Sequence, residues 1–209
     1  THFTLCYLIV LLATFSLYEC GYIFNDTISI LKEEQPALRL YPANFEHFNR
    51  WKYLISGSRL FYALLALTGL RFLGINTYPL LKLCASLVLM CFLFALYNTW
   101  RNRYNVWLYP FLVCSRYIPF MLLSEHEWWI FLLLFVSFQL VNSLERFSMP
   151  IYRWPIMRIF IPSESSKTLF RACYYVIVLL IVCPLIYLSG HSLWLLSPII
   201  LLGIYRIGL

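Results

Sequence analysis

The chain has 209 residues, of which 62% are hydrophobic and only 12% charged, and its formal net charge is +7. A soluble domain carries about twice that charged fraction. Apolar stretches of about 20 residues recur along the sequence, which excludes a soluble globular fold and the alternating pattern of a β-barrel. The composition therefore predicts an all-α protein, a polytopic transmembrane helical bundle forming a single domain over residues 1–209.

About seven apolar stretches are long enough, as helices, to cross a hydrocarbon layer of roughly 30 Å. In chain order they cover about 4–24, 58–76, 80–98, 105–124, 127–144, 169–188 and 191–208. The chain begins with Thr, and its first stretch lacks the layout of a signal peptide. We therefore expect one further transmembrane helix before residue 1.

The basic residues predict the orientation of the bundle. Thirteen of the 16 Lys and Arg residues lie on the side that carries the longer loops, predicted at about 25–57, 99–104 and 145–168. The positive-inside rule makes that side cytoplasmic. The net charge then reflects topology and contact with anionic lipid rather than nucleic acid. We predict an integral protein of the bacterial inner membrane, with membrane lipid as a partner and no nucleic-acid partner.

The cysteine and histidine residues give no sign of a metal site or a disulfide framework. All seven cysteines fall in hydrophobic stretches without a C-x-x-C pair, and the four histidines are scattered. This pattern is typical of small buried thiols. Zinc is not predicted.

The first polar cluster, YIFNDTISILKEEQPALRLYP, covers residues 22–42 at the end of the first span. It contains Asn25, Asp26, Glu33 and Arg39. Charge at a bilayer boundary is costly unless it is solvated, paired or bound to a metal. The cluster is therefore the first candidate site.

If the first helix continues past Asn25, then Glu19, Tyr22, Asp26 and Glu33 share one helix face. Oxygen ligands of this kind suit Mg²⁺, which accepts one or two carboxylates together with substrate phosphates. The alternative is a polar helix end in which Asn25 and Asp26 form a cap or turn.

Two further clusters supply arginines. The segment LYNTWRNRY at 96–104 contains Tyr97, Arg101 and Arg103, and Arg is suited to bidentate contact with phosphate oxygens. Ordinary anchoring by positive charge is the alternative. Arg116 lies near the middle of a span, between two prolines that are expected to kink or open that helix. A charge there must meet an anion or a water-filled cavity, and an ion pair with Glu19 is the alternative.

The fourth cluster, LVNSLERFSMPIYRWPIMRIF, covers residues 140–160. Asn142, Glu145 and Arg146 end the fifth apolar stretch, and the Arg, aromatic and Pro residues that follow are typical of a segment lying in the membrane interface. Pure lipid anchoring is the alternative. Residues 43–57 have a similar pattern and predict a short interfacial helix.

In the order of its motifs the chain resembles the UbiA superfamily of intramembrane prenyltransferases. That resemblance implies a nine-helix bundle open sideways to lipid. It also implies an NDxxDxxxD motif after the second helix, a Tyr- and Arg/Lys-rich motif after the fourth and a second acidic motif after the sixth. Here YIFNDTISILKEE follows the first visible span, LYNTWRNR the third and LVNSLER the fifth. One missing N-terminal helix would bring all three into step.

Within the superfamily the pattern looks closest to the decaprenyl-phosphate phosphoribosyltransferase branch. Asn25 and Asp26 match the start of the first motif, and Arg116 matches an Arg in the helix after the Tyr-basic motif. The sequence departs from the family at Ser29, where a second aspartate is expected, and at Glu33, which replaces the third.

The resemblance implies transfer on an isoprenoid lipid, either a prenyl diphosphate or a polyprenyl phosphate, with Mg²⁺-assisted loss of pyrophosphate. It implies roles for three groups of residues: catalysis by Asp26, Glu33 and Glu145; metal binding by Asn25, Asp26 and Glu33; and substrate binding by Arg39, Tyr97, Arg101, Arg103, Arg116 and Arg146. One alternative is a catalytically degenerate lipid-binding or structural subunit of a complex with other membrane subunits. Another is a small transporter with Glu19 and Arg116 as ligands.

Overall fold

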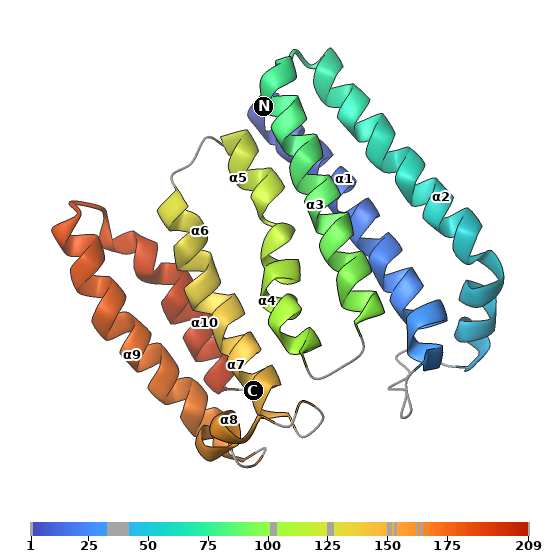
Figure 1. Ribbon diagram of the computed structural model, residues 1–209. Coiled ribbons are helices and arrows are strands. Elements are labelled where there is room, and N and C mark those ends of the chain that lie inside the picture. Colours follow the sequence, from blue (N-terminus) through green and yellow to red (C-terminus); the bar gives the residue numbers. More distant parts are fainter. Residues whose placement is uncertain are drawn as a thin grey trace. The chain divides into compact units, whose positions relative to one another are not determined.

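The computed structural model describes residues 2–32, 42–100, 104–124, 128–149, 152, 154–161, 163 and 165–208. Within these ranges the secondary structure is helical and contains no strand, which confirms the all-α fold class. The elements, drawn in Figure 1, are α1 His2–Phe24, η1 Asn25–Ser29, η2 Ile30–Lys32, α2 Pro42–Phe72, α3 Thr77–Thr99, α4 Asn105–Ser115, α5 Ile118–Ser124, α6 Trp128–Leu134, η3 Phe135–Leu140, α7 Val141–Ser148, α8 Pro155–Phe160, α9 Ser166–Leu188, η5 Leu193–Leu196 and α10 Ser197–Ile207.

Five helices in the described part of the chain are long and apolar enough to cross a membrane. They cover His2–Ser29, Asn44–Phe72, Thr77–Thr99, Asn105–Leu123 and Ser166–Leu188. These are the properties of an integral membrane protein. The two remaining predicted stretches correspond to helical segments over Trp128–Ser148 and Leu193–Ile207, and a total of seven crossings stays a prediction.

The first helix continues beyond its predicted end, and the second begins earlier than predicted. A π-helical turn and a 3-10 turn extend α1 as far as Lys32, and α2 runs without a break from Pro42 to Phe72. The prediction of a loop over 25–57 is therefore wrong for the described residues. The helix predicted over 43–57 is present, but it is the start of the longer helix α2 and not a short helix of its own. Since no proline or glycine interrupts 43–56, the polar start of α2 is continuous with its membrane span.

The chain divides into two compact units, which we describe separately. Unit 1 comprises Thr1–Arg101 and Phe111–His126, and unit 2 comprises Asn102–Pro110 and Glu127–Leu209. Whether the whole chain behaves as the single predicted domain stays a prediction.

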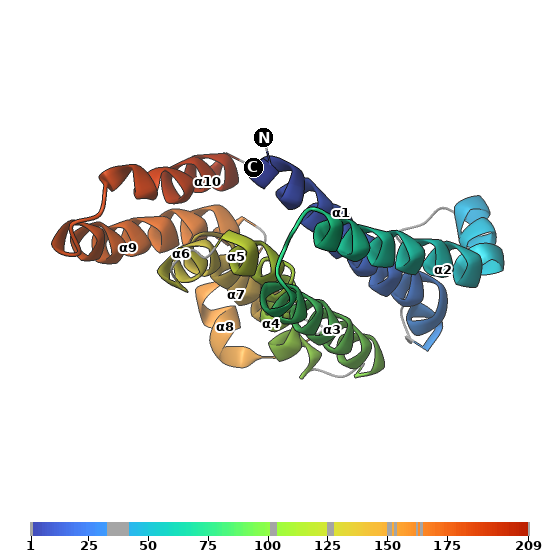
Figure 2. The ribbon, with the colours of Figure 1, turned by 90° about the horizontal axis from the view of Figure 1, so that it is seen from above.

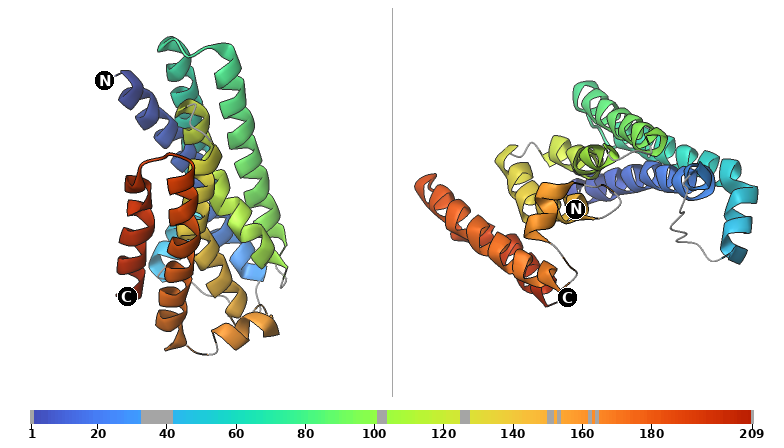
Figure 3. Two further views of the ribbon diagram at one scale, coloured as in Figure 1. Left: turned by 90° about the vertical axis from the view of Figure 1, so that its left-hand side faces the viewer. Right: turned by 60° about the horizontal axis from the view of Figure 1, so that its bottom comes forward.

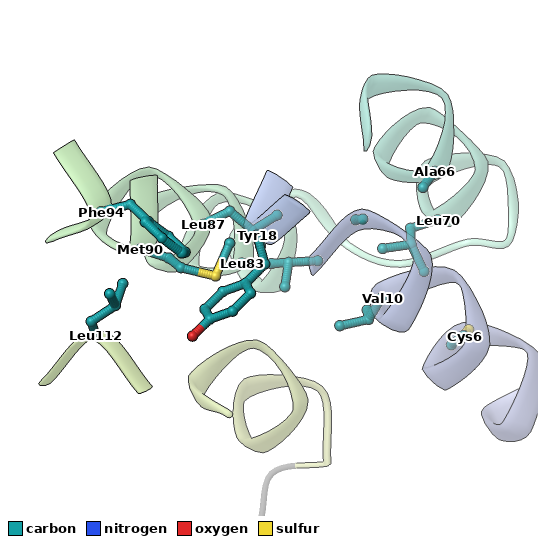
Figure 4. Packing of buried hydrophobic residues seen from close by; sticks show 11 residues of the cluster. Cys6, Val10, Tyr18, Ala66, Leu70, Leu83, Leu87, Met90, Phe94 and Leu112 are labelled. Carbon is teal, nitrogen blue, oxygen red and sulfur yellow. The ribbon is translucent and has the colours of Figure 1, made fainter. Parts of the chain in front are cut away.

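Unit 1 is built around α1, which packs against both α2 and α3. Its buried core includes Val10, Leu70, Leu87 and Met90. Figure 4 shows Val10 of α1 beside Leu70 of α2, and the ring of Tyr18 near the α3 side chains Leu83 and Met90. The outer sides of these helices carry exposed leucine and phenylalanine side chains, as expected where a helix faces lipid.

Gly21 of α1 lies directly against Phe94 of α3. A Cβ atom added at Gly21 would lie 2.4 Å from the Phe94 ring, so the ring packs directly on the α1 backbone. Tyr18 and Tyr22 surround the same ring, with centroids 4.7 Å and 5.6 Å from that of Phe94. Gly21 thereby fixes the end of α1 that carries the first polar cluster.

We expect Gly21→Ala to destabilise the protein by about 1–2 kcal/mol, because overpacking outweighs the better helix propensity of Ala. The matched control is Gly69→Ala in α2, where the added Cβ meets nothing within 4 Å. That change is expected to raise stability by up to about 1 kcal/mol. Thermal unfolding of the detergent-purified variants measures both effects, and equal shifts of the same sign would contradict the close packing.

Two short links end in the same backbone arrangement. Gly74 and Gly190 have φ angles of +85° and +70°. The amides of the residues that follow them, Ile75 and His191, donate back to the carbonyls of Leu70 and Ile186. This pattern satisfies orphan carbonyls at a helix end and favours glycine because of its positive φ. It explains how α2 turns into α3, and α9 into η5, within a few residues.

Unit 2 is formed by α6, η3 and α7 together with the pair α9 and α10. Figures 2 and 3 show α9 and α10 side by side and joined by a short connection. Their core contains Val141, Tyr175, Val178 and Ile199 among other apolar side chains. Tyr175 also packs closely on the backbone of Gly203 in α10, at 3.2 Å from the position of an added Cβ.

Candidate functional site

The structure describes six of the ten predicted site residues. Asn25, Asp26, Tyr97 and Arg116 lie in unit 1, and Glu145 and Arg146 lie in unit 2. Glu33, Arg39, Arg101 and Arg103 lie outside the described residues, and their predicted roles stay predictions.

A cavity of about 250 Å³ lies at the end of α1 in unit 1. Its walls come from α1, η1 and α2, and the lining residues are Glu19, Tyr22, Ile23, Asp26, Thr27, Phe48 and Arg59. The predicted sharing of one helix face by Glu19, Tyr22 and Asp26 is therefore confirmed. The cavity combines two carboxylates, one guanidinium and two aromatic rings at the end of a helix that is long and apolar enough to span a membrane.

Asp26 lies in a π-helical turn, Asn25–Ser29, in which the amide of Ile30 donates to the carbonyl of Asn25. Such turns are rare and often occur at functional sites. Nδ2 of Asn25 donates to Oδ1 of Asp26 at 2.8 Å, so the two side chains lie together. The alternative of Asn25 and Asp26 as a helix cap is wrong, since the helix continues through both residues.

Glu19 forms an ion pair with Arg59 of α2, with Nε of Arg59 2.6 Å from Oε2 of Glu19. Both side chains are partly exposed, Arg59 by 38% and Glu19 by 49%. The partner of Glu19 is therefore Arg59, and the alternative of an ion pair between Glu19 and Arg116 is wrong. The sequence did not single out Arg59, because the spacing of residues does not show which helices pack together.

Arg116 lies at the break between α4 and α5, and Pro119 is the second residue of α5. The helix therefore opens next to Pro119, whereas Pro110 lies inside α4, so the prediction that the prolines kink or open the helix agrees with the structure at Pro119 and not at Pro110. Its Nη2 donates to the hydroxyl of Tyr117 at 2.9 Å, and the guanidinium lies 5.6 Å from the ring centroid of Tyr18. Nε of Arg116 is buried without a hydrogen-bond partner in the described part of the chain.

The α3 residues next to this region have structural contacts. Tyr97 is partly buried against the unit 1 core. Nδ2 of the neighbouring Asn98 donates to the carbonyl of Gly21 at 3.0 Å, which ties α3 to the end of α1.

In unit 2, two arginines hold Glu145. Arg171 of α9 contacts both carboxylate oxygens, with Nε 2.9 Å from Oε1 and Nη2 3.2 Å from Oε2. Nη2 of Arg206 in α10 is also 2.9 Å from Oε1, and its Nη1 donates to Oδ1 of Asn142. Glu145 and Arg206 are both 8% exposed. We name these four residues the Glu145 cluster.

The Glu145 cluster places one buried carboxylate between two guanidinium groups. Nη1 of Arg171 also donates to the main-chain carbonyl of Arg206 at 2.9 Å, so three helices meet at one carboxylate. Taking one partner from such a buried arrangement leaves an uncompensated charge. In this geometry Glu145 acts as a counter-ion, and its predicted catalytic role stays a prediction.

A second π-helical segment, Phe135–Leu140, precedes the Glu145 cluster. The hydroxyl of Tyr175 donates to the carbonyl of Ser137 at 2.9 Å, and that of Tyr174 donates to the carbonyl of Val136. Both tyrosines come from α9 and bind carbonyls inside the irregular segment. The irregular segment is thus held by side-chain donors, as buried main-chain groups require.

Arg146, next to Glu145 in sequence, points elsewhere: its guanidinium lies 3.8 Å from the ring centroid of Tyr109. The neighbouring Trp107 packs against Phe147 and Trp154, with centroid distances of 4.4 Å and 5.6 Å. Edge-to-face packing of this kind stabilises a cluster of aromatic side chains.

Within the described ranges, no group of three or more His, Cys, Asp or Glu side chains could hold a metal ion. Mg²⁺ does not require such a group, since it keeps waters and takes one or two carboxylates plus substrate phosphates. Asp26, with the Asn25 side chain beside it, offers a carboxylate and an amide oxygen, which are donors of the required chemistry, whereas the Glu19 carboxylate in the same cavity is paired with Arg59. Asn25 and Asp26 fit a magnesium ion that is held in part by its substrate.

No protein-family model, no curated protein and no solved structure matches this chain.

Proposed function

We propose that the protein is an intramembrane transferase of the UbiA type, acting on an isoprenoid lipid with loss of pyrophosphate. The observation that carries the proposal is the cavity that joins Asp26, Glu19 and Arg59 at the end of a membrane-spanning helix. Charged groups at such a position are expensive, which favours a functional role. The motif order supports the same proposal.

In this proposal Asn25, Asp26 and Glu33 hold Mg²⁺, and Arg39, Tyr97, Arg101, Arg103 and Arg116 bind the diphosphate or phosphate group. The metal ion would supply positive charge to the leaving pyrophosphate. The side chains of this chain orient the anion, and the exposed apolar faces of α1 to α3 leave the isoprenoid tail in lipid. We further propose that the protein resides in the bacterial inner membrane with its motif loops facing the cytoplasm.

The test is binding of a prenyl diphosphate and, separately, of phosphoribosyl pyrophosphate to the detergent-purified protein, with MgCl₂ and with EDTA. We expect binding of at least one ligand that is lost with EDTA. The preferred ligand identifies prenyl or phosphoribosyl transfer. No metal-dependent binding of either ligand would contradict a transferase.

The second candidate is a lipid-binding or structural subunit of a membrane complex. It is favoured by the Glu145 cluster, in which arginines occupy the carboxylate of the second acidic motif. Stable co-purification with another membrane protein, together with ligand binding that ignores magnesium, would support it.

A further inference from the structure

We propose that Arg59, in the unit 1 cavity, is a further residue that binds the phosphate group and that Glu19 positions it. This inference rests on the proposed function. Arg59 is a basic residue of α2, which contributed none of the site residues predicted from the sequence. Glu19 receives a role although it lies before the acidic motif that begins at Asn25.

The first argument is the geometry of Arg59. Its side chain lines the cavity that also contains Asp26, and its Nε lies 2.6 Å from Oε2 of Glu19. The contact with Glu19 is made through Nε, and no hydrogen bond to a terminal nitrogen of Arg59 is found in the described part of the chain. The contact with Glu19 is therefore an ion pair that leaves the terminal nitrogens able to bind a ligand. Two parallel N–H groups match the spacing of phosphate oxygens.

The second argument is the charge of the cavity. Among the described lining residues, Glu19 and Asp26 contribute two negative charges and Arg59 one positive charge, so these three side chains sum to a formal charge of −1. That charge repels an anion that arrives alone. A divalent cation brings the total to +1, so cation and phosphate bind better together than either does by itself. By linkage, each then raises the affinity for the other by the same factor.

The third argument is the position of Glu19. It lies on the same face of α1 as Asp26, seven residues earlier, which is about 10 Å along the helix axis. Glu19 therefore contacts Arg59 about two helical turns before Asp26, and Asp26 lies nearer the end of the helix. Glu19 is therefore a positioning residue, and the group that touches the phosphate is Arg59.

The experiment measures binding of inorganic pyrophosphate to the full chain in detergent by calorimetry, with MgCl₂ and with EDTA. We expect Arg59→Gln to weaken magnesium-dependent pyrophosphate binding by about 10- to 100-fold, the usual effect of losing a hydrogen bond to a charged group. Binding of Mg²⁺ alone is expected to stay the same or tighten, because a positive charge has left the cavity. The matched control is Arg71→Gln in the last turn of α2, where Nη1 donates to the carbonyl of Ile75.

Glu19→Gln tests the positioning role. Because the cavity charge rises from −1 to 0, pyrophosphate binding in EDTA should become stronger than in the wild type, while binding with MgCl₂ weakens. A purely structural ion pair would lower thermal stability and leave this magnesium dependence unchanged.

The results distinguish a failure of the role proposed for Arg59 from a failure of the proposed function. Wild-type binding with equal affinity in Arg59→Gln would overturn the role of Arg59 and leave the proposed transferase standing. A parallel loss of Mg²⁺ and pyrophosphate binding in Arg59→Gln would also overturn it. A wild type that binds no pyrophosphate with MgCl₂ would overturn both the role of Arg59 and the proposed function.

Discussion

Asp26→Asn is expected to abolish transfer while the protein stays folded. The substitution keeps the size of the side chain and its place beside Asn25, but removes a negative charge from the cavity that also contains Glu19 and Arg59. The loss of one electrostatic contact to a reacting group typically lowers turnover by about 10²–10³-fold. Pyrophosphate release by the purified variant measures the effect, and the thermal unfolding midpoint checks that the fold is intact.

The control is Glu46→Gln in α2, which removes an exposed carboxylate that does not line the cavity. Its turnover should match that of the wild type, which shows that the effect of Asp26→Asn comes from the cavity and not from a change in net charge. Full turnover in Asp26→Asn would contradict a metal-binding role for this residue.

Glu145→Gln is expected to destabilise unit 2 by about 3–5 kcal/mol. The substitution leaves the buried guanidinium groups of Arg171 and Arg206 without their counter-charge, and breaking one partner of a buried ion pair typically has this effect. For a chain of this length the unfolding midpoint should fall on the order of 10 °C. Differential scanning of the purified variant in detergent measures the shift.

Two further variants keep this test decisive. Adding Arg206→Gln to Glu145→Gln removes one of the uncompensated charges and should restore part of the lost stability. Arg146→Gln changes the adjacent residue, whose guanidinium lies over the ring of Tyr109, and should cost less than about 2 kcal/mol. If Glu145→Gln instead leaves the unfolding midpoint unchanged and lowers turnover, Glu145 has the catalytic role that the family resemblance implies.

The positions of the long helices and the grouping of Glu19 with Asp26 could be predicted from the sequence. Apolar runs report membrane-spanning length directly, and three- and four-residue spacing reports a shared helix face. The break next to Arg116 could be predicted from Pro119, whereas Pro110, also expected to disturb the helix, lies inside α4. These features depend on residues that are close in sequence, so the residue pattern alone was enough to predict them.

The partners of the buried charges could not be predicted in the same way. Arg59 lies 40 residues from Glu19, while Arg171 and Arg206 lie 26 and 61 residues from Glu145. Their pairing depends on which helices pack together, and the apolar sequence of a helix does not indicate which other helix it packs against. The continuous α2 was also missed, because charged and aromatic residues at its start look like a surface segment.

The two π-helical segments have a consequence for how this chain can change length. A π turn holds one more residue than an α turn, so it corresponds to a single-residue insertion absorbed inside a continuous helix. Deleting one residue from Asn25–Ser29 or Phe135–Leu140 would return that segment to α geometry while the flanking helix keeps its own pairing. An insertion elsewhere in a spanning helix rotates every later side chain by about 100°. The π segments are therefore the positions in these helices where residues can be gained or lost with the least effect on packing.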